Sequence, residues 1–599
     1  MPKKQIAALL TCVLSACLPA ARCAERLRGE ASRFLRFNAD SPVDWMPWGP
    51  EAFARAKAEQ KPIFVFVGSY TSELSRAMCS QTFANAVTSK WLNEQFVCVM
   101  VDRQERPDLG NLYEAYVVRV KQLNGWPLNI WLTPDLLPFE GAAYLGPSED
   151  WGRPGFLNEA NAAKTAWATN RAGCLSRAAE AVSHLAPDVS PAPGTWGPEK
   201  SKARLSAAAT AWMSTYDQAD GGFTTPPKNP EPELLRFLLM QTAPDRDAAL
   251  MTLRALSTSA VRDPLDGGFF RYAVDSKWNL PYPQKTLADQ ARMALAFLDA
   301  AHGADKGAFE QCARGALDFA LSRLAKPDGT FASAVDATDD SFAGYYAWTE
   351  SEIDKALGAD SAAFKMAHGV KPAGNIPQDD DPSGVYANKS ILRSSNDTGA
   401  GLAADAALLL ALRDQRPSPS IDDRATAGDH GLILSALARA GKQLGEPRYR
   451  AAATRTLDAV KASFLVSPGG DLRRLAGASW PAAPVDYAAL ALGCRDYAGA
   501  FGDMGANALA GRLLARLDLQ FYDQASRQYF SAPPQAGPGI FVRTLVDGDV
   551  PAPESLALLA GETAEMAKAL SGAQLDSLDE GNPQAPGDQL LALAAATGK

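Results

Sequence analysis

An apolar run at residues 61–68, KPIFVFVG, sets the strongest constraint on how the first part of this chain folds. The run is short, rich in β-branched and aromatic residues, and ends at a glycine, which is typical of a buried strand entering a turn. Further strand-like runs at 96–102 and 126–132 alternate with helical patterns at about 72–94 and 108–121. This alternation predicts a sheet with helices on its faces.

Length and charge limit the class of protein. The 599 residues correspond to about three to four domain equivalents, since a single core rarely grows that large. The formal net charge is −9, and we find no concentrated basic face of the kind that binding to phosphates requires. We therefore expect no nucleic-acid partner.

The N-terminus has the layout of a secretory signal. Lys3 and Lys4 precede an apolar run at 6–18, which is too short to span a bilayer comfortably. Within it, residues 14–17 resemble the lipobox of bacterial lipoproteins, in which the Cys17 thiol would be lipidated; ordinary cleavage after Ala20 is the alternative. Residues 1–24 are thus expected to direct export to the periplasm or cell envelope, with a lipid on Cys17 as the only membrane attachment.

Beyond this leader the cysteines are scattered and odd in number. They are Cys79, Cys98, Cys174, Cys312 and Cys494. Their spacing matches no metal-binding pattern, so we expect no metal site, and nothing else in the sequence indicates a cofactor. The sequence leaves disulfide pairing open.

The composition changes at a Pro- and Gly-rich segment, and residues 187–199 are interpreted as a linker. Beyond it, amphipathic helical patterns fill residues 200–599. Short glycine turns followed by apolar residues recur between them, as at 220–223, 266–269, 328–331 and 469–472. Such recurrence predicts a repeated helical hairpin, and six hairpins in a ring form an (α/α)6 barrel.

Several long motifs closely resemble one known family, that of spermatogenesis-associated, thioredoxin-like proteins. The resemblance covers nearly the whole mature chain. It implies a multidomain fold: a thioredoxin-like α/β domain at 25–186, followed by an all-α (α/α)6 toroid of the six-hairpin glycosidase-like type. It also places Pro127 where thioredoxin-like folds carry a cis-proline. The motifs are SPVDW (41–45), PWG (47–49), KPIF (61–64), VDRQERPD (101–108) and GWPL (125–128).

The chain departs from this family at the redox turn. Members typically read CHWCHVM, whereas residues 72–78 here read SELSRAM, with Ser72 and Ser75 at the two cysteine positions. Disulfide exchange requires a thiolate and a second thiol, which serine hydroxyls cannot replace. Ser72 is instead well suited to cap the following helix, and Cys79, a helical turn further on, is expected to pack in the core. We therefore predict a degenerate, non-redox site.

A second departure concerns the mouth of the barrel. Relatives read approximately PHFEKMLYD where residues 281–289 read PYPQKTLAD, so Tyr282 and Gln284 replace a histidine and a glutamate. Neither replacement serves as an acid or base near neutral pH. Relatives also read WNGL at 429–432 and PSGNS at 551–555, where this chain reads DHGL and PAPES.

Candidate site residues are carboxylates, one histidine, and aromatic or polar groups that recognise sugars by stacking and hydrogen bonding. The alternative for each is a structural role, with acids capping helices and aromatics filling the barrel. The catalytic candidates are Asp275, Asp289, Asp422, Asp486 and His430. The ligand-binding candidates are Arg271, Tyr272, Trp278, Lys285, Asp336, Tyr346, Trp348 and Tyr487.

Three functions follow from these features. The leading hypothesis is an exported, non-redox protein that binds a carbohydrate-like or cell-envelope ligand in the barrel, with the thioredoxin-like domain as a scaffold. The second is a carbohydrate-active hydrolase or epimerase that uses the barrel-mouth carboxylates. The third is a protein-interaction module with a plugged barrel. The sequence leaves the oligomeric state open.

Overall fold

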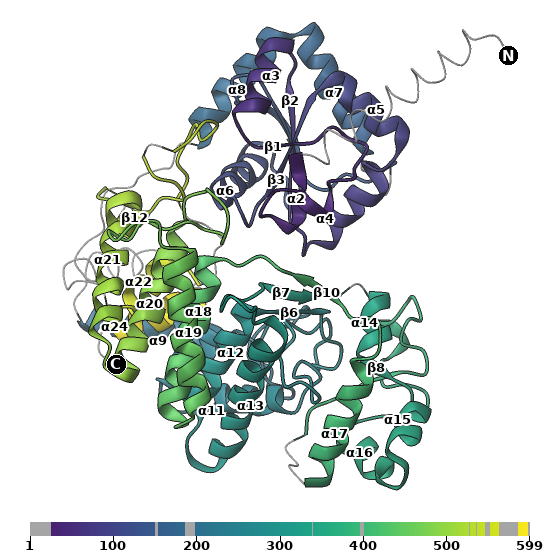
Figure 1. Cartoon of the computed structure of the whole chain (residues 1–599), viewed down its shortest axis with the longest axis vertical. Helices are drawn as coiled ribbons and strands as arrows, with labels where there is room; N and C mark the ends of the chain where they lie inside the picture. The colour runs from purple at the N-terminus through teal and green to yellow at the C-terminus, as the bar shows by residue number, and fades with distance from the viewer. Residues whose placement is uncertain are drawn as a thin grey trace, which may run out of the picture.

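The structure is a computed structural model that describes residues 26–149, 154–185, 198–337, 339–395, 400–525, 527–534, 536–545, 551–561 and 585–596. The expected signal segment and all but the end of the expected linker lie outside these residues. Figure 1 shows an α/β domain standing above a larger helical domain. The fold class predicted from the sequence is confirmed.

A five-stranded sheet forms the centre of the first domain. The strand order is β1-β3-β2-β4-β5, in which β1, β3 and β2 run parallel and β4 and β5 are antiparallel to their neighbours. β2 and β3 are buried along their whole length, as their continuous apolar runs predict. The peptide bond before Pro127, next to the start of β4, is cis. The strands are β1 (Met46–Pro47), β2 (Ile63–Gly68), β3 (Val97–Asp102), β4 (Leu128–Leu132) and β5 (Pro138–Ala142).

Helices cover both faces of this sheet. One face packs against α2, η1, α5 and α7, and the other against α3, α6 and the end of α8. The helix predicted at 72–94 is interrupted, because Asn85 caps a new helix within it; Asn170 likewise separates α7 from α8. The helices are α2 (Arg33–Phe37), α3 (Pro50–Glu59), α4 (Glu73–Ala77), η1 (Met78–Thr82), α5 (Ala86–Gln95), α6 (Pro107–Ala115), η2 (Tyr116–Val120), α7 (Phe156–Thr169) and α8 (Arg171–Leu185).

The second domain is built on a closed ring of six inner helices. Each contacts the next, from α10 through α12, α18, α20, α22 and α24 back to α10, and outer helices pack around them. The inner helices are α10 (Pro232–Leu239), α12 (Leu287–Ala300), α18 (Ala427–Gln443), α20 (Pro484–Phe501), α22 (Pro553–Leu559) and α24 (Gly587–Ala596). The described outer helices are α9 (Pro198–Met213), α11 (Asp245–Ser257), α13 (Lys306–Phe319), α19 (Pro447–Ser463) and α21 (Met504–Phe521).

Small residues let the ring close tightly. A side chain at Gly431 of α18 would collide with the backbone of Ala489 in α20, and one at Gly493 would collide with Gly431. The turn before α12 is equally tight, because Gly267 adopts φ +78° and rests against Gly315 of α13. The glycine turns seen in the sequence thus lie between an outer helix and the next inner one.

A small subdomain, not foreseen from the sequence, interrupts the toroid between α13 and α18. Its core includes Trp348, Ile353, Phe364 and Leu409. Its two ends, β7 and β10, pair with each other, and β7 also pairs with β6, which gives a three-stranded sheet of order β10-β7-β6. The elements are β6 (Gln284–Thr286), β7 (Ala334–Asp336), α14 (Asp339–Tyr345), β8 (Ala347–Trp348), α15 (Glu350–Leu357), α16 (Ser361–His368), β9 (Ser390–Ile391), α17 (Ala400–Arg413) and β10 (Ser420–Asp422). Among the described helices, none combines the length and apolarity that crossing a membrane demands.

Candidate functional site

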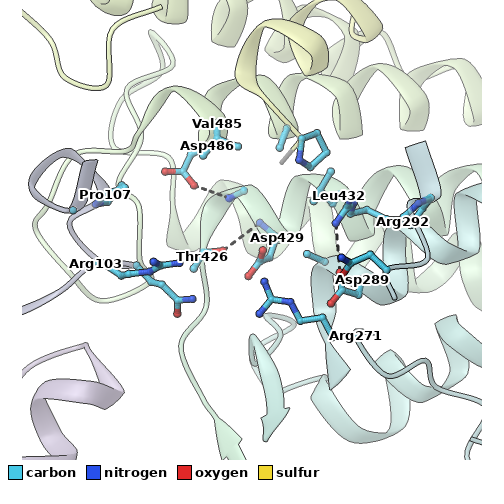
Figure 2. A pocket seen from close by; sticks show the side chains of 18 of the residues that line it. Arg103, Pro107, Arg271, Asp289, Arg292, Thr426, Asp429, Leu432, Val485 and Asp486 are labelled. Carbon is cyan, nitrogen blue, oxygen red and sulfur yellow. Dashed lines mark hydrogen bonds and ion pairs between the residues drawn. The ribbon is translucent and has the colours of Figure 1, made fainter. Parts of the chain in front are cut away.

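A cavity of about 730 Å³ lies between the two domains, at the mouth of the toroid. Its wall from the first domain is the β3–α6 loop and α6, which contribute Arg103, Gln104 and Glu114, together with Trp126. The toroid supplies the opposite wall from the starts of α10, α12, α18 and α20. We call this space the mouth cavity (Figure 2).

Acidic residues occupy the third position of three inner helices at this mouth. They are Asp289 of α12, Asp429 of α18 and Asp486 of α20. Negative charge is favourable there, because the exposed N–H groups and the helix dipole make a helix N-terminus positive. The sequence therefore places carboxylates here for helix stability, whatever further use the cavity makes of them.

The three carboxylates differ in the hydrogen bonds that neighbouring residues donate to them. Asp486 accepts hydrogen bonds from the backbone of Gly428 at 2.9 Å and Ala483 at 2.8 Å, and pairs with Arg474 at 2.8 Å. Asp289 accepts from the Thr286 hydroxyl at 2.7 Å. Asp486 is thus held in place as a structural group, while Asp289 retains more freedom to contact a ligand.

Asp429 is the most chemically distinctive of the three. Its Oδ2 accepts a hydrogen bond from the Ser333 hydroxyl at 3.2 Å, and burial raises the pKa of its carboxyl. Burial likewise raises the pKa of Glu231, which precedes α10 at the rim of the same cavity. The mouth cavity thus contains carboxyl groups that hold a proton more tightly than an exposed acid does.

Arginines face these acids. Arg292 donates a hydrogen bond from its Nε to Glu233 at 2.8 Å. Its Nη1 lies 3.4 Å from Oδ1 of Asp289. Arg271 donates to the neutral amide of Gln284 at 2.9 Å. In Figure 2 the side chains of Arg271, Asp289 and Asp429 turn toward the same space. These three groups form the polar floor of the mouth cavity.

The first domain contributes an aromatic wall. The indole N–H of Trp126 donates to Glu114 at 3.0 Å, and the guanidinium of Arg103 stacks on the Trp126 ring at 4.2 Å. All three residues line the cavity. A flat ring beside charged and hydrogen-bonding groups suits a ligand that is partly apolar and rich in hydroxyls.

The redox turn has a serine at each of the two positions where the family resemblance leads us to expect a cysteine. Ser72 caps α4 by accepting a hydrogen bond from the Ser75 N–H at 3.2 Å, and Ser75 is fully buried. Cys79 is buried in η1, and burial raises the pKa of its thiol to about 12. The described cysteines, Cys79, Cys98, Cys174, Cys312 and Cys494, are all buried and form no disulfide with one another. A thiol with such a pKa carries almost no thiolate at neutral pH.

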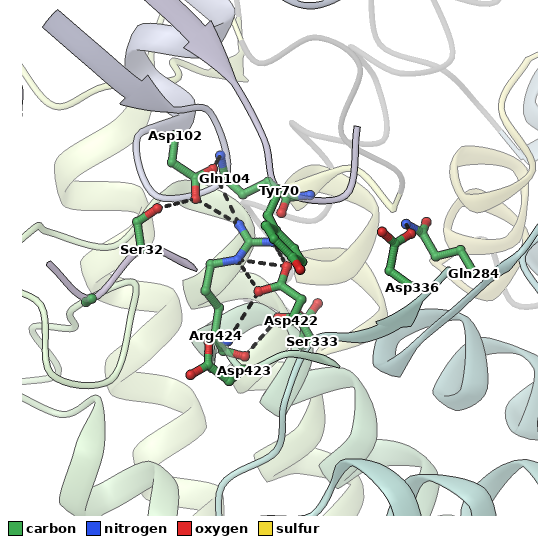
Figure 3. Close-up of polar contacts among 12 residues, drawn as sticks. Ser32, Tyr70, Asp102, Gln104, Gln284, Ser333, Asp336, Asp422, Asp423 and Arg424 are labelled. Carbon is green, nitrogen blue, oxygen red and sulfur yellow. Dashed lines mark hydrogen bonds and ion pairs between the residues drawn. The ribbon is translucent and has the colours of Figure 1, made fainter. Parts of the chain in front are cut away.

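This turn contacts the toroid directly. Arg76 of α4 pairs with Asp336 of β7 at 2.6 Å, and Gln284 of β6 donates to the other oxygen of Asp336 at 3.1 Å. Arg424 donates hydrogen bonds to Asp422 at 2.9 Å and to Asp102 of β3 at 3.3 Å, and so links the two domains. Asp102 also accepts a hydrogen bond from the Ser32 hydroxyl (Figure 3). Asp336 and Asp422 therefore hold the domains together.

Of the predicted catalytic residues, the structure brings Asp289 and Asp486 to the mouth cavity. Asp275 instead accepts backbone hydrogen bonds within its own loop, from Asn279 and Leu280. His430 is fully buried between Phe331 and Phe464, its Nε2 accepts from the Phe331 N–H at 2.9 Å, and burial lowers its pKa to about 4. Its Nδ1 lies 2.6 Å from the carbonyl oxygen of Thr426, so both ring nitrogens are engaged and His430 is a structural histidine.

Of the predicted ligand-binding residues, only Arg271 lines the mouth cavity. Lys285 is fully buried and pairs with Asp263 at 2.7 Å and Asp266 at 2.8 Å, which corrects its expected place in a ligand site. Trp278, Tyr346, Trp348 and Tyr487 are also buried, and Tyr272 stacks on Tyr282 with centroids 4.5 Å apart. The aromatics mostly fill the core, as the structural alternative proposed.

Sequence reasoning missed the whole wall from the first domain. Arg103, Gln104 and Trp126 lie within motifs that carried the family resemblance, yet nothing local shows that they face a second domain. Asp429 could have been found, because it occupies the same position in its helix as Asp289 and Asp486 do in theirs. In the part of the chain that the structure describes, no group of three or more metal-binding side chains comes together.

Comparison with known proteins gives a family match for the first domain. Residues 24–186 match the family model Thioredox_DsbH, which is described as "Protein of unknown function, DUF255". Solved structures show a faint likeness: a β-1,3-1,4-glucanase from Paenibacillus sp. X4 aligns with TM-score 0.38 and 10% identity over 69% of this chain and 96% of its own. The unsaturated glucuronyl hydrolase of Bacillus sp. GL1 aligns with TM-score 0.32 and 9% identity over 70% and 84%. We therefore assign the toroid from the closed ring of contacts among its inner helices.

Curated relatives match far more closely. Spermatogenesis-associated protein 20 of Homo sapiens is 30% identical over 581 residues, which cover 88% of this chain and 74% of the human protein. The protein of the same name from Mus musculus is 30% identical over 88% of this chain and 73% of its own length. The chain belongs to the spermatogenesis-associated protein 20 family.

Proposed function

We propose that this chain is an exported, non-redox member of its family that binds a carbohydrate-like ligand in the mouth cavity. The observation that carries the proposal is one cavity of about 730 Å³ whose lining combines the polar floor of Arg271, Asp289 and Asp429 with the Trp126 ring. Charged acceptors and donors beside an aromatic face are the groups that recognise hydroxyl-rich rings. The thioredoxin-like domain then serves as one wall of the site.

A binding experiment with point variants tests this proposal. The purified protein would be titrated with neutral and acidic oligosaccharides, and hits compared between wild type, Arg271→Ala and Asp429→Asn. We expect both variants to lose at least about tenfold in affinity, which is the effect of removing one good polar contact. Asp247→Asn, an exposed acid on α11, is the matched control. Full affinity in both mouth variants would contradict the proposed site.

The raised pKa of Asp429 favours a second candidate, a hydrolase or epimerase acting on the same ligand class. A buried acid whose pKa is raised is suited to donate a proton, and a second carboxyl nearby, such as Asp289, supplies the other group that this chemistry requires. Asp429→Asn would then lower turnover by about 100-fold or more while the protein still binds. Binding without turnover in the wild-type protein would support the binding role alone.

The third candidate, an interaction module with a plugged barrel, has less support. The inner helices do pack closely, but the mouth cavity stays open above them. Absence of any glycan binding, together with co-purification of a stable protein partner, would favour this candidate instead.

We also propose that residues 1–24 direct export and that Cys17 carries a lipid. The support is the sequence pattern alone. Membrane association in cell fractions that is lost in Cys17→Ala would bear out the lipid anchor. Recovery of the wild-type protein in the soluble periplasmic fraction would favour ordinary cleavage after Ala20.

A further inference from the structure

A second cavity, of about 430 Å³, lies on the other side of the β3–α6 loop. Arg103 and Gln104 line the mouth cavity, whereas Asp102, Glu105 and Arg106 line this one. Its remaining walls are residues 29–31 and 46–51 of the first domain and the toroid loop at 477–480. We call it the loop cavity.

Glu105 is the unusual group in the loop cavity. Glu105 is only 4% exposed, and its Oε1 is buried without a hydrogen-bond partner. Burial, reinforced by the nearby charges of Asp102 and Glu30, raises the pKa of Glu105 to about 8. An unpaired buried carboxyl is unfavourable, so this position calls for a partner that the described residues do not supply.

The charges around Glu105 show which partner is missing. Asp102 is already bound by Ser32 at 2.7 Å and by Arg424. Arg106 gives two hydrogen bonds to Asp108, at 2.9 Å and 2.7 Å, while its Nη1 is buried without a hydrogen-bond partner. Among the described residues the Glu30 carboxylate makes no ion pair, and burial raises its pKa too. Since Arg106 is paired with Asp108, ionisation of Glu105 and Glu30 would leave an excess of negative charge in the loop cavity, which a bound cation would offset.

The apolar part of the lining distinguishes an organic cation from a metal ion. Met46, Trp48 and Trp480 face the same cavity as the two free carboxyls. A divalent metal ion prefers several oxygen ligands and water, and no suitable cluster exists among the described residues. An ammonium group on a short carbon chain would contact both the carboxyls and the rings.

We propose that the loop cavity is a binding site for a small organic cation bearing a primary amine, held by Glu105 and Glu30. The amine donates hydrogen bonds to the two carboxylates, and its carbon chain packs against Trp48 and Met46. This site is separate from the mouth cavity and does not depend on the function proposed there.

Calorimetric titration of the full mature protein tests this site, with n-propylammonium and putrescine as probes. 1-Propanol and propionate, of similar size, are the neutral and anionic controls. We expect the amines to bind and the controls not to bind. Glu105→Gln should weaken the amine affinity at least about tenfold, because a charge-assisted contact becomes a neutral one. Glu94→Gln, an exposed acid on α5, and Arg271→Ala in the mouth cavity should leave it unchanged.

Glu30→Gln gives a second route if Glu105→Gln fails to fold, since Glu30 is only half-buried. Its amine affinity should also fall. Three results would overturn the proposal: no amine binding to wild type, equal binding of 1-propanol, or unchanged amine affinity in both glutamate variants. Stabilisation by Mg²⁺ or Ca²⁺ in place of the amines would overturn the choice of an organic cation.

Discussion

The guanidinium of Arg76 and the carboxylate of Asp336 form a 2.6 Å ion pair across the boundary between the two domains. Arg76 follows the degenerate redox turn, and Asp336 also accepts a hydrogen bond from Gln284. The family resemblance leads us to expect a histidine in place of Arg76 and a glutamate in place of Gln284. The two departures from the family pattern, which are far apart in the sequence, thus meet at the carboxylate of Asp336. At the redox turn, this chain has a polar contact between the two domains.

Removal of Arg76 should destabilise the protein in a pH-dependent way. Burial raises the pKa of Asp336 to about 6 even with Arg76 present, so its carboxyl is protonated in the folded state at lower pH. Arg76→Ala would leave a buried carboxylate unpaired at pH 8, with an expected loss of about 1 to 3 kcal/mol. At pH 5 the loss should be smaller, because Asp336 can then be neutral. Thermal unfolding across this range measures the effect.

The control for this variant is Arg28→Ala, whose ion pair with Asp40 is exposed. It should change stability little at either pH. An equal loss in Arg76→Ala at pH 5 and pH 8 would show that the carboxyl of Asp336 is not the group responsible.

His430 should make the protein sensitive to acid. Its pKa is lowered to about 4 in the folded state, against about 6.5 in an unfolded chain. The unfolded state therefore binds the proton first, so stability is complete above pH 6.5 and falls as pH drops toward 4. The full effect is about 3 kcal/mol for this one group.

His430→Gln removes this proton site, so its stability should vary less between pH 6.5 and 4 than that of wild type. Denaturant titrations at several pH values give the slope. His184→Gln, which removes an exposed histidine, should keep the wild-type slope. A steep acid loss that persists in His430→Gln would assign it to other groups.

Lys285 should prove to be a stabilising residue with no role in ligand binding. It shares Asp263 and Asp266 with Arg413, and Lys285, Asp263 and Arg413 are almost wholly buried. Lys285→Met would leave two buried carboxylates facing one cation, with an expected loss of about 3 to 5 kcal/mol. Differential scanning fluorimetry and limited proteolysis of the inserted subdomain would detect it.

Lys277→Met, on an exposed loop nearby, is the matched control and should unfold like wild type. A normal melting temperature in Lys285→Met combined with lost ligand binding would restore the sequence-based interpretation of Lys285.

The described cysteines should resist alkylation in the native protein. All five are buried, and burial raises the thiol pKa to about 12 at both Cys79 and Cys494. Iodoacetamide labelling followed by peptide mass spectrometry should therefore modify these five cysteines only after denaturation. The protein should also fail to reduce insulin above background. Rapid native labelling of Cys79 would reopen the question of thiol chemistry.

Local pattern predicted the architecture well. The buried strands, the helical hairpins and the capping role of Ser72 all follow from periodicity and side-chain chemistry over a few residues. The site residues were harder to predict, because carboxylates at inner-helix starts look alike in sequence. Asp289 reaches a cavity, whereas Asp422 pairs with Arg424, which also donates to Asp102, more than 300 positions away in the first domain.

The sequence alone determined that a thioredoxin-like sheet precedes a helical toroid and that the redox turn at Ser72 and Ser75 has lost its thiols. These features depend on residue type and short-range order. Only the tertiary structure decided that the toroid mouth faces the β3–α6 loop, that this loop separates two cavities, and that Arg76 meets Asp336. Such contacts join residues hundreds of positions apart, and their burial and charge balance exist only once both domains have packed together.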